Sequence, residues 1–140
     1  MKNLLYYFIL ITIIFFPFDR LFSQSEKIKW IEPEEIIKFQ QSNPKKIMID
    51  LYTDWCGWCK VMDRTTFSDK NVAEKINSNF YPIKINAEYK GEINFNNKIY
   101  KYLDAKPRGI NELAYYLTNG QLSYPMTIFL DEEFRIITLL

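Results

Sequence analysis

The chain has 140 residues, of which 48% are hydrophobic and 17% aromatic, and this suits a single domain with a sizeable core. Eighteen basic and seventeen acidic residues give a formal net charge of +1, and because no basic stripe stands out we expect no nucleic-acid partner. The chain has no histidine, so imidazole cannot serve as a general base, a metal ligand or a pH switch. Its two cysteines are too few to close a zinc site, and we expect no metal and no other cofactor.

The N-terminal segment, residues 1–23, reads as a signal peptide. Lys2 precedes an apolar run from Leu4 to Phe18, which is shorter than the roughly 20 residues of a membrane span. The alternative is an uncleaved N-terminal anchor, which would be the chain's contact with the membrane. Residues 24–140 then form one domain in the periplasm or outside the cell. Such an oxidising compartment suits a chain whose cysteines all lie in one motif, because stray cysteines would mispair there.

Five apolar segments rich in β-branched and aromatic residues are predicted to be strands. They span residues 28–31, 47–52, 81–87, 126–130 and 134–140. Residues 93–100 alternate about Asn96-Asn97, and this pattern is typical of a β-hairpin. A turn at Asp131-Glu132-Glu133 is expected before the last strand.

Helices are predicted between these segments. The first has Pro33 at its N1 position and is ended by Ser42-Asn43-Pro44. A second continues from Cys59, and a third has Ser68 as its N-cap. A fourth covers residues 110–118 and is closed by Gly120 at its C-terminus.

The chain is organised around Trp55-Cys56-Gly57-Trp58-Cys59-Lys60, which directly follows the strand at residues 47–52 and contains both cysteines. A Cys-x-x-Cys pair where a strand passes into a helix is the arrangement that redox thiol chemistry needs. The first sulfur then lies over the helix N-terminus, where unpaired N–H groups and the helix dipole stabilise a thiolate. The second sulfur is close enough to form a disulfide with the first and to resolve a mixed disulfide.

Residues 47–60 resemble the active-site segment of the thioredoxin superfamily, and most of all secreted thioredoxin-like proteins of Bacteroidetes-type bacteria with the same Trp-Cys-Gly-Trp-Cys-Lys site. The similarity extends from about residue 50 to residue 131 and includes Tyr124-Pro125-Met126-Thr127, at the position of the family's cis-proline. It implies an α/β, thioredoxin-like three-layer fold, in which helices flank a central mixed β-sheet and a hairpin is inserted before the third helix. Such proteins normally end with one more helix, which is missing here, so we expect a fragment or a shortened fold.

The resemblance also implies catalytic roles. Cys56 is expected to be the exposed nucleophile and Cys59 the buried resolving thiol. Asp50 matches the family's buried acid, whose raised pKa lets it accept the proton of Cys59. Lys84 matches the lysine that pairs with this acid. The alternatives are a strand-end polar residue for Asp50 and a solvated strand lysine for Lys84.

Five further residues are expected to meet the substrate. Gly57 is expected to let the backbone turn tightly where a substrate chain approaches. Trp55 is expected to shield the site or contact substrate. Trp58, where thioredoxin has proline, is expected to contact substrate, and the alternative is an exposed aromatic residue that covers the disulfide. A cis bond between Tyr124 and Pro125 would face the disulfide and offer a backbone edge to an extended substrate.

These observations predict a thiol–disulfide oxidoreductase that reduces disulfides of exported proteins through its Cys-Gly-Trp-Cys dithiol. Its substrates would be protein thiols and disulfides, and a separate redox partner would supply electrons. Reduction is favoured because strongly oxidising members of the superfamily often have a histidine between the cysteines. Two alternatives stay open: a disulfide isomerase or oxidase, and a thioredoxin-fold binding module whose disulfide is static.

Overall fold

The computed structural model describes residues 26–140, so the predicted signal segment at residues 1–23 lies outside the described residues. The helices are a 3-10 turn, η1 (Pro33–Glu35), which runs directly into α2 (Ile36–Ser42), then α3 (Gly57–Arg64), α4 (Lys70–Asn79) and α5 (Glu112–Thr118). The strands are β1 (Lys46–Tyr52), β2 (Phe80–Asn86), β3 (Ile93–Phe95), β4 (Lys98–Tyr100), β5 (Tyr102–Leu103), β6 (Ile110–Asn111), β7 (Met126–Leu130) and β8 (Ile136–Leu139). In this part of the chain, no helix has the length and apolar character that crossing a membrane requires.

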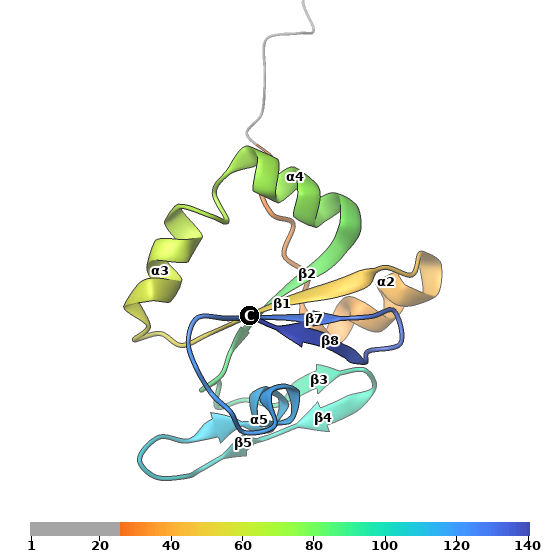
Figure 1. Ribbon diagram of the computed structural model, residues 1–140. Coiled ribbons are helices and arrows are strands. Elements are labelled where there is room, and N and C mark those ends of the chain that lie inside the picture. Colours follow the sequence, from red (N-terminus) through yellow and green to blue (C-terminus); the bar gives the residue numbers. More distant parts are fainter. Residues whose placement is uncertain (1–25) are drawn as a thin grey trace, which may run out of the picture.

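A four-stranded sheet in the order β2-β1-β7-β8 forms the middle layer (Figure 1). The sheet is mixed, because β1 pairs parallel with β2 and antiparallel with β7, and β7 pairs antiparallel with β8. Helices α3 and α4 lie on one side of the sheet, while α5 and the β3–β4 hairpin lie on the other (Figure 1). The predicted three-layer α/β fold is confirmed, and the hairpin is inserted ahead of α5.

Strand β1 positions the site because its two faces meet different layers. Alternate side chains of a strand point to opposite faces of the sheet, and all but the end residues of β1 are buried. The odd-numbered residues from Ile47 to Leu51 join the large core, whereas Met48 packs in a smaller core with residues of α4. Asp50 shares the alternation of Met48, so it is directed to the side that carries α3 and α4.

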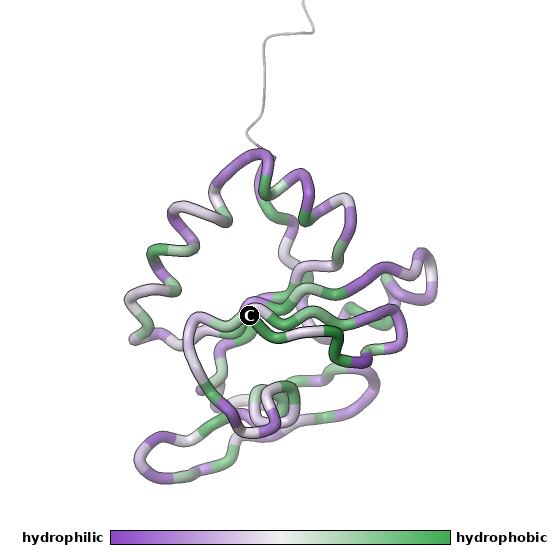
Figure 2. Tube along the Cα trace, in the orientation of Figure 1, coloured by the Kyte–Doolittle hydropathy of each residue, from purple (hydrophilic) through white to green (hydrophobic). Residues whose placement is uncertain are grey.

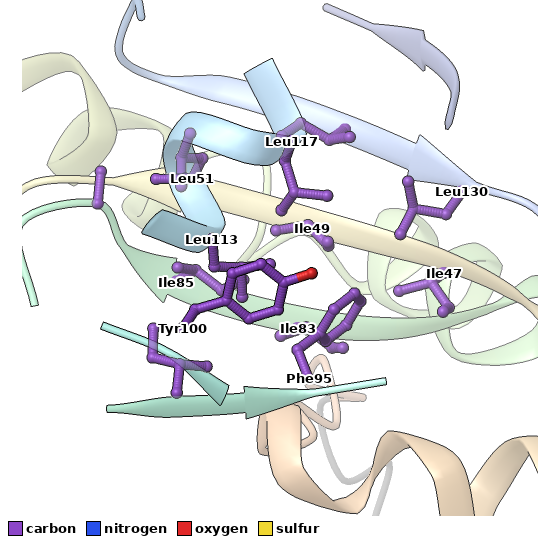
Figure 3. Packing of buried hydrophobic residues seen from close by; sticks show 14 of the residues in the cluster. Ile47, Ile49, Leu51, Ile83, Ile85, Phe95, Tyr100, Leu113, Leu117 and Leu130 are labelled. Atoms are coloured by element: carbon purple, nitrogen blue, oxygen red, sulfur yellow. The ribbon is translucent and has the colours of Figure 1, made fainter. Parts of the chain in front are cut away.

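The large core fills the space between the sheet and the layer of α5 and the hairpin. Leu113 and Leu117 from α5, and Phe95 and Tyr100 from the hairpin, point toward the apolar side chains of β1 and β2 (Figure 3). Burying a side chain of this size stabilises a fold by about 1.5–3 kcal/mol. Hydrophobic stretches follow the central strands, and hydrophilic residues gather at the tips of the hairpins (Figure 2).

Two predicted local signals have the expected outcome. Pro33 opens the first helical segment, which begins as a 3-10 turn and continues into α2. Asn96 and Asn97 form the hairpin turn with φ of 51° and 57°. Asparagine tolerates this left-handed conformation better than other non-glycine residues do, so the turn suits this pair.

The predicted strand at residues 28–31 and the predicted N-cap at Ser68 are wrong. Only Ile31 pairs with the sheet, in an isolated bridge to Ile83. Helix α4 is capped instead by Asp69, whose carboxylate accepts hydrogen bonds from the backbone N–H groups of Asn71 and Val72 in the first turn of the helix. The Ser68 hydroxyl donates instead to the carbonyl of Asp63. A carboxylate at the N-cap also interacts favourably with the helix dipole, and this explains the shift by one residue.

Three predicted boundaries also move. Residues 110–111 pair as strand β6 with the short β5, and α5 begins only at Glu112, where the Asn111 side chain caps it. The left-handed residue that ends α5 is Asn119, with Gly120 following in the same region. The last strand, β8, begins at Ile136 instead of residue 134, because Phe134 adopts a positive φ of 65° in the preceding turn.

Candidate active site

The two cysteines form a disulfide at the start of α3. Cys56 is the N-cap residue of this helix, with φ −69° and ψ 103°. Its Sγ accepts a hydrogen bond of 3.0 Å from the backbone N–H of Cys59, and the Cα atoms of the two residues lie 5.3 Å apart. The predicted position of the first sulfur at a helix N-terminus is confirmed, and at such a place backbone N–H groups stabilise a thiolate.

Both cysteines are buried in this oxidised state. Cys56 is 4% exposed and Cys59 is 3% exposed. The expectation of an exposed Cys56 is therefore wrong for the closed disulfide, whereas the expected burial of Cys59 is confirmed. The physical reason is that the Cys56 sulfur is bonded to Cys59 and lies against the first turn of α3, where it accepts a backbone hydrogen bond.

Asp50 and Lys84 meet across the parallel strands β1 and β2. The register of β1 and β2 places them side by side, and Lys84 Nζ donates a hydrogen bond of 2.7 Å to Asp50 Oδ2. The side chain of Asp50 is 1% exposed and that of Lys84 is 24% exposed. The structure thus brings both residues together as a largely buried ion pair, and their catalytic roles stay predictions.

Lys84 has a second carboxylate partner, which lies on α3. Its Nζ also donates a hydrogen bond to Asp63, whose side chain is 42% exposed. The ring centroids of Trp30, Tyr52 and Phe67 lie 5.3, 4.9 and 5.8 Å from Lys84 Nζ. Aromatic faces attract a cation at such distances, so the ammonium is surrounded by favourable partners. We call this group the lysine cluster: Lys84, Asp50, Asp63, Trp30, Tyr52 and Phe67.

Burial and charge act on the pKa values of this cluster. Desolvation raises the pKa of Asp50 and the negative charge of Asp63 adds to the rise, while the hydrogen bond from Lys84 opposes it without cancelling it. Burial lowers the pKa of Lys84, but its hydrogen bonds to the two carboxylates outweigh that effect and the pKa is raised. The other carboxylate oxygen, Asp50 Oδ1, has no hydrogen-bond partner within the described residues. A buried carboxylate with a raised pKa and a free oxygen is suited to accept a proton.

Trp55, which directly precedes Cys56, is 52% exposed yet contacted on several sides. Its Nε1–H donates a hydrogen bond of 2.9 Å to Glu88. The guanidinium of Arg108 lies 4.4 Å from the ring centroid, and the Tyr124 ring meets the indole edge-on at 5.8 Å. Arg108 Nη1 lies 3.9 Å from the same Glu88 oxygen. We call Trp55, Glu88, Arg108 and Tyr124 the tryptophan cluster.

The remaining predicted site residues take different positions. Trp58 is 74% exposed on the first turn of α3. Gly57 is the first residue of α3 and lacks a positive φ, and an added Cβ there would meet no atom within 4 Å, so its role in substrate approach stays a prediction. The space in front of Gly57 is therefore open. The bond between Tyr124 and Pro125 is cis, as predicted, and a second cis bond precedes Pro107.

Sequence reasoning missed the three aromatic residues of the lysine cluster and three charged residues of the two clusters, namely Asp63, Glu88 and Arg108. Asp63 lies one helical turn after Cys59, so the helical period could have placed it on the face that carries this cysteine. Glu88 and Arg108 lie in irregular segments, and no sequence pattern brings them to Trp55. Across residues 26–140, no three Cys, Asp or Glu side chains are grouped as metal ligands.

The sheet order, the flanking helices and the Cys-x-x-Cys disulfide at a helix N-terminus define a thioredoxin-fold protein. Residues 20–139 match the profile of the thioredoxin-like DsbH family, described as "Protein of unknown function, DUF255". The chain belongs to this family.

Relatives and solved structures agree with this fold. The chain is 26% identical over 106 residues to an uncharacterised protein of Caenorhabditis elegans, covering 75% of this chain and 12% of that protein. It is 46% identical over 39 residues to the thiol:disulfide interchange protein DsbD of Actinobacillus pleuropneumoniae serotype 5b (strain L20), covering 28% of this chain and 7% of DsbD. The chain thus spans about a tenth of the length of these curated relatives. A solved structure of DsbH oxidoreductase aligns with a TM-score of 0.57 at 14% identity, covering 81% of this chain and 72% of that one.

Proposed function

We propose that this protein is a thiol–disulfide oxidoreductase that reduces disulfides of exported proteins through Cys56 and Cys59. The observation that carries the proposal is the disulfide at the N-terminus of α3, combined with a buried carboxylate, Asp50, whose pKa is raised. The relative DsbD is a thiol:disulfide interchange protein by name, and this similarity supports the proposal.

In the first step of the proposed reaction, the Cys56 thiolate attacks one sulfur of a substrate disulfide. The substrate S–S bond breaks, and the departing substrate sulfur leaves as a thiolate that takes a proton from water. Cys56 is then joined to the substrate by a mixed disulfide. The backbone N–H of Cys59, which donates to Cys56 Sγ in the oxidised state, supports negative charge on this sulfur.

In the second step, the Cys59 thiol passes its proton to Asp50 and the resulting thiolate attacks Cys56 Sγ. The mixed disulfide breaks, the second substrate thiolate leaves, and the Cys56–Cys59 bond closes. Two electrons have then passed from the protein dithiol to the substrate disulfide. Lys84 and Asp63 line part of a cavity of about 570 Å³, and we expect the proton that Asp50 later releases to reach solvent on the side of these two residues.

The direction and the compartment are also part of the proposal. We assign reduction because no histidine lies between the cysteines, and we assign a periplasmic or secreted location because residues 1–23 have the pattern of a signal peptide. In such an oxidising compartment a separate dithiol partner has to return electrons to the protein after each turnover.

The decisive test is trapping with the Cys59→Ser variant. This variant should accumulate a mixed disulfide with an exported protein at Cys56, because the resolving thiol is gone. The matched Cys56→Ser variant should trap nothing, and mass spectrometry of the adducts names the substrates. If the Cys59→Ser variant, reduced beforehand, forms no adducts, the proposed oxidoreductase function is contradicted.

A static disulfide in a binding module is the second candidate, and the burial of both cysteines favours it. The two candidates differ in thiol reactivity. In the reduced oxidoreductase, Cys56 should be alkylated by iodoacetamide at pH 6 much faster than a model thiol, because a larger fraction is thiolate. A rate no faster than that of the model thiol would favour the binding module.

A further inference from the structure

A cavity of about 320 Å³ opens next to the tryptophan cluster. Its lining includes Trp55 and Tyr124, Tyr115 of α5, Leu122 and residues 107–110. The residues that directly precede Cys56 and Pro125 in the chain thus line this cavity. Neither the disulfide exchange at Cys56 nor the lysine cluster uses it.

Large apolar side chains gather at its rim while remaining accessible. Tyr115 is 53% exposed, Leu122 is 41% exposed and Trp55 is 52% exposed. Exposed apolar patches of this kind mark interaction sites, and tyrosine, tryptophan and arginine are the residues most enriched in them. The position beside the reactive disulfide identifies the occupant as a part of the substrate itself.

The two charged groups at the rim, Glu88 and Arg108, already contact each other and Trp55. Glu88 accepts the hydrogen bond of Trp55 and lies 3.9 Å from Arg108, while the Arg108 guanidinium covers the indole face. A charged substrate side chain entering here would lose water and would have to compete with these existing contacts for a counter-charge, and such a transfer is costly. An aliphatic or aromatic side chain would lose only unfavourable contact with water.

We propose that this cavity is a specificity pocket that receives an apolar side chain adjacent to the attacked cysteine of an extended substrate polypeptide. The inference rests on the proposed function and names the class of substrate for the same site: polypeptides whose cysteine is flanked by aliphatic or aromatic residues. Arg108 acts as a positioning residue that holds Trp55 as the wall of the pocket.

The test uses peptides of the form Gly-Xaa-Cys-Xaa-Gly, in which the cysteine is a mixed disulfide with 5-thio-2-nitrobenzoate and Xaa is Leu, Ser or Glu. When reduced Cys56 attacks the peptide sulfur, the peptide–nitrobenzoate S–S bond breaks and the coloured thiolate leaves, so absorbance reports the second-order rate constant. The full chain should react about tenfold faster with the Leu peptide than with the Ser peptide, and slowest with the Glu peptide.

The double variant Tyr115→Ala/Leu122→Ala should lower the Leu-to-Ser ratio to about twofold or less. Because both peptides are compared on one protein sample, any loss of folded material cancels from the ratio. The matched control is Ile99→Ala/Ile137→Ala, which removes two apolar side chains that are 54% and 52% exposed but do not line this cavity. That control should keep the wild-type ratio.

Equal rates for the Leu and Ser peptides on the wild-type protein would overturn the pocket, as would an undiminished ratio in the Tyr115→Ala/Leu122→Ala variant. Hydroxyethyl disulfide, which is too small to fill the pocket while it reacts at Cys56, separates this failure from a wider one. If the reduced wild-type protein exchanges with hydroxyethyl disulfide but shows no peptide preference, the pocket alone is wrong. If it exchanges with neither, the oxidoreductase function is wrong and the pocket proposal falls with it.

Discussion

The lysine cluster and the tryptophan cluster contain the same kinds of groups but differ in burial. Each places a cation against aromatic rings and within reach of a carboxylate. The side chain of Lys84 is 24% exposed, whereas that of Arg108 is 58% exposed. Lys84 projects from strand β2 of the main sheet, while Arg108 belongs to the loop between β5 and β6.

The difference in burial decides what such a cluster can do. Around Lys84 the loss of water moves the pKa of Asp50 upward, and this makes its carboxylate a better proton acceptor. Around Arg108, solvent screens the charges, and the main result is an indole held in one orientation at the surface. One cluster is therefore suited to proton transfer, and the other to contact with a partner.

Replacing Asp50 with Asn should have the largest kinetic effect, because it removes the proton acceptor while keeping the shape of the side chain. Resolution of the mixed disulfide by Cys59 should slow about 100-fold, whereas the first attack by Cys56 should change little. Single-turnover kinetics with a peptide mixed disulfide separate the two steps. Equal slowing of both steps would contradict the role assigned to Asp50.

The same Asp50→Asn variant should be as stable as the wild type at pH 7, or more stable. The folded-state pKa of Asp50 is raised, so its favourable contribution is present below its unfolded pKa and is lost as pH rises through the folded pKa. In its ionised form the buried carboxylate carries a desolvation cost, and Asn removes that cost. Urea unfolding at pH 7 and pH 4 should show any gain shrinking at the lower pH.

Replacing Lys84 with Met should destabilise the protein by about 1–3 kcal/mol at pH 7, because it leaves the Asp50 carboxylate buried without its hydrogen-bond donor. The pKa of Asp50 should then rise further, so the loss should shrink as pH falls through that pKa and the carboxyl group becomes neutral. Lys75→Met on the exposed face of α4 makes the same change of charge and serves as the control. An equal loss in both variants would remove the distinction between buried and exposed cations.

Replacing Asp63 with Asn should have a smaller effect on stability, at most about 1 kcal/mol, because this carboxylate is partly exposed. Its negative charge raises the pKa of Asp50, so its removal should lower that pKa. The pH dependence of the resolution rate should move to lower pH, while Glu74→Gln, which changes the same charge on an exposed helix position, should leave it in place. An unmoved profile in Asp63→Asn would show that the two carboxylates are not coupled.

Replacing Arg108 with Gln should have the smallest effect on the free energy of unfolding, about 0.5 kcal/mol or less, because its stacking on Trp55 is exposed to solvent. The indole should become more mobile, with lower fluorescence anisotropy for Trp55 measured in a variant that retains this tryptophan alone. Lys90→Gln, in a nearby loop, is the control. A destabilisation as large as that of Lys84→Met would show that exposure does not separate the two clusters.

Features encoded by neighbouring residues could be predicted from the sequence. Strand β1 follows from its run of apolar residues, and the start of α3 follows from the cysteine motif, because both depend on side chains close in the chain. The Asn96-Asn97 turn follows from the left-handed conformation that asparagine tolerates. The short strands β5 and β6 escaped prediction, because two residues carry no periodicity.

The sequence by itself determined the redox pair, its position at a helix N-terminus and, through the family resemblance, the identity of the buried acid and its lysine. Only the tertiary structure decided that Lys84 is shared with Asp63 and that Arg108 and Glu88 hold Trp55, because these contacts join segments that are far apart in the chain. It also decided that Cys56 is buried when oxidised. Exposure depends on how separate elements pack, and no local pattern encodes it.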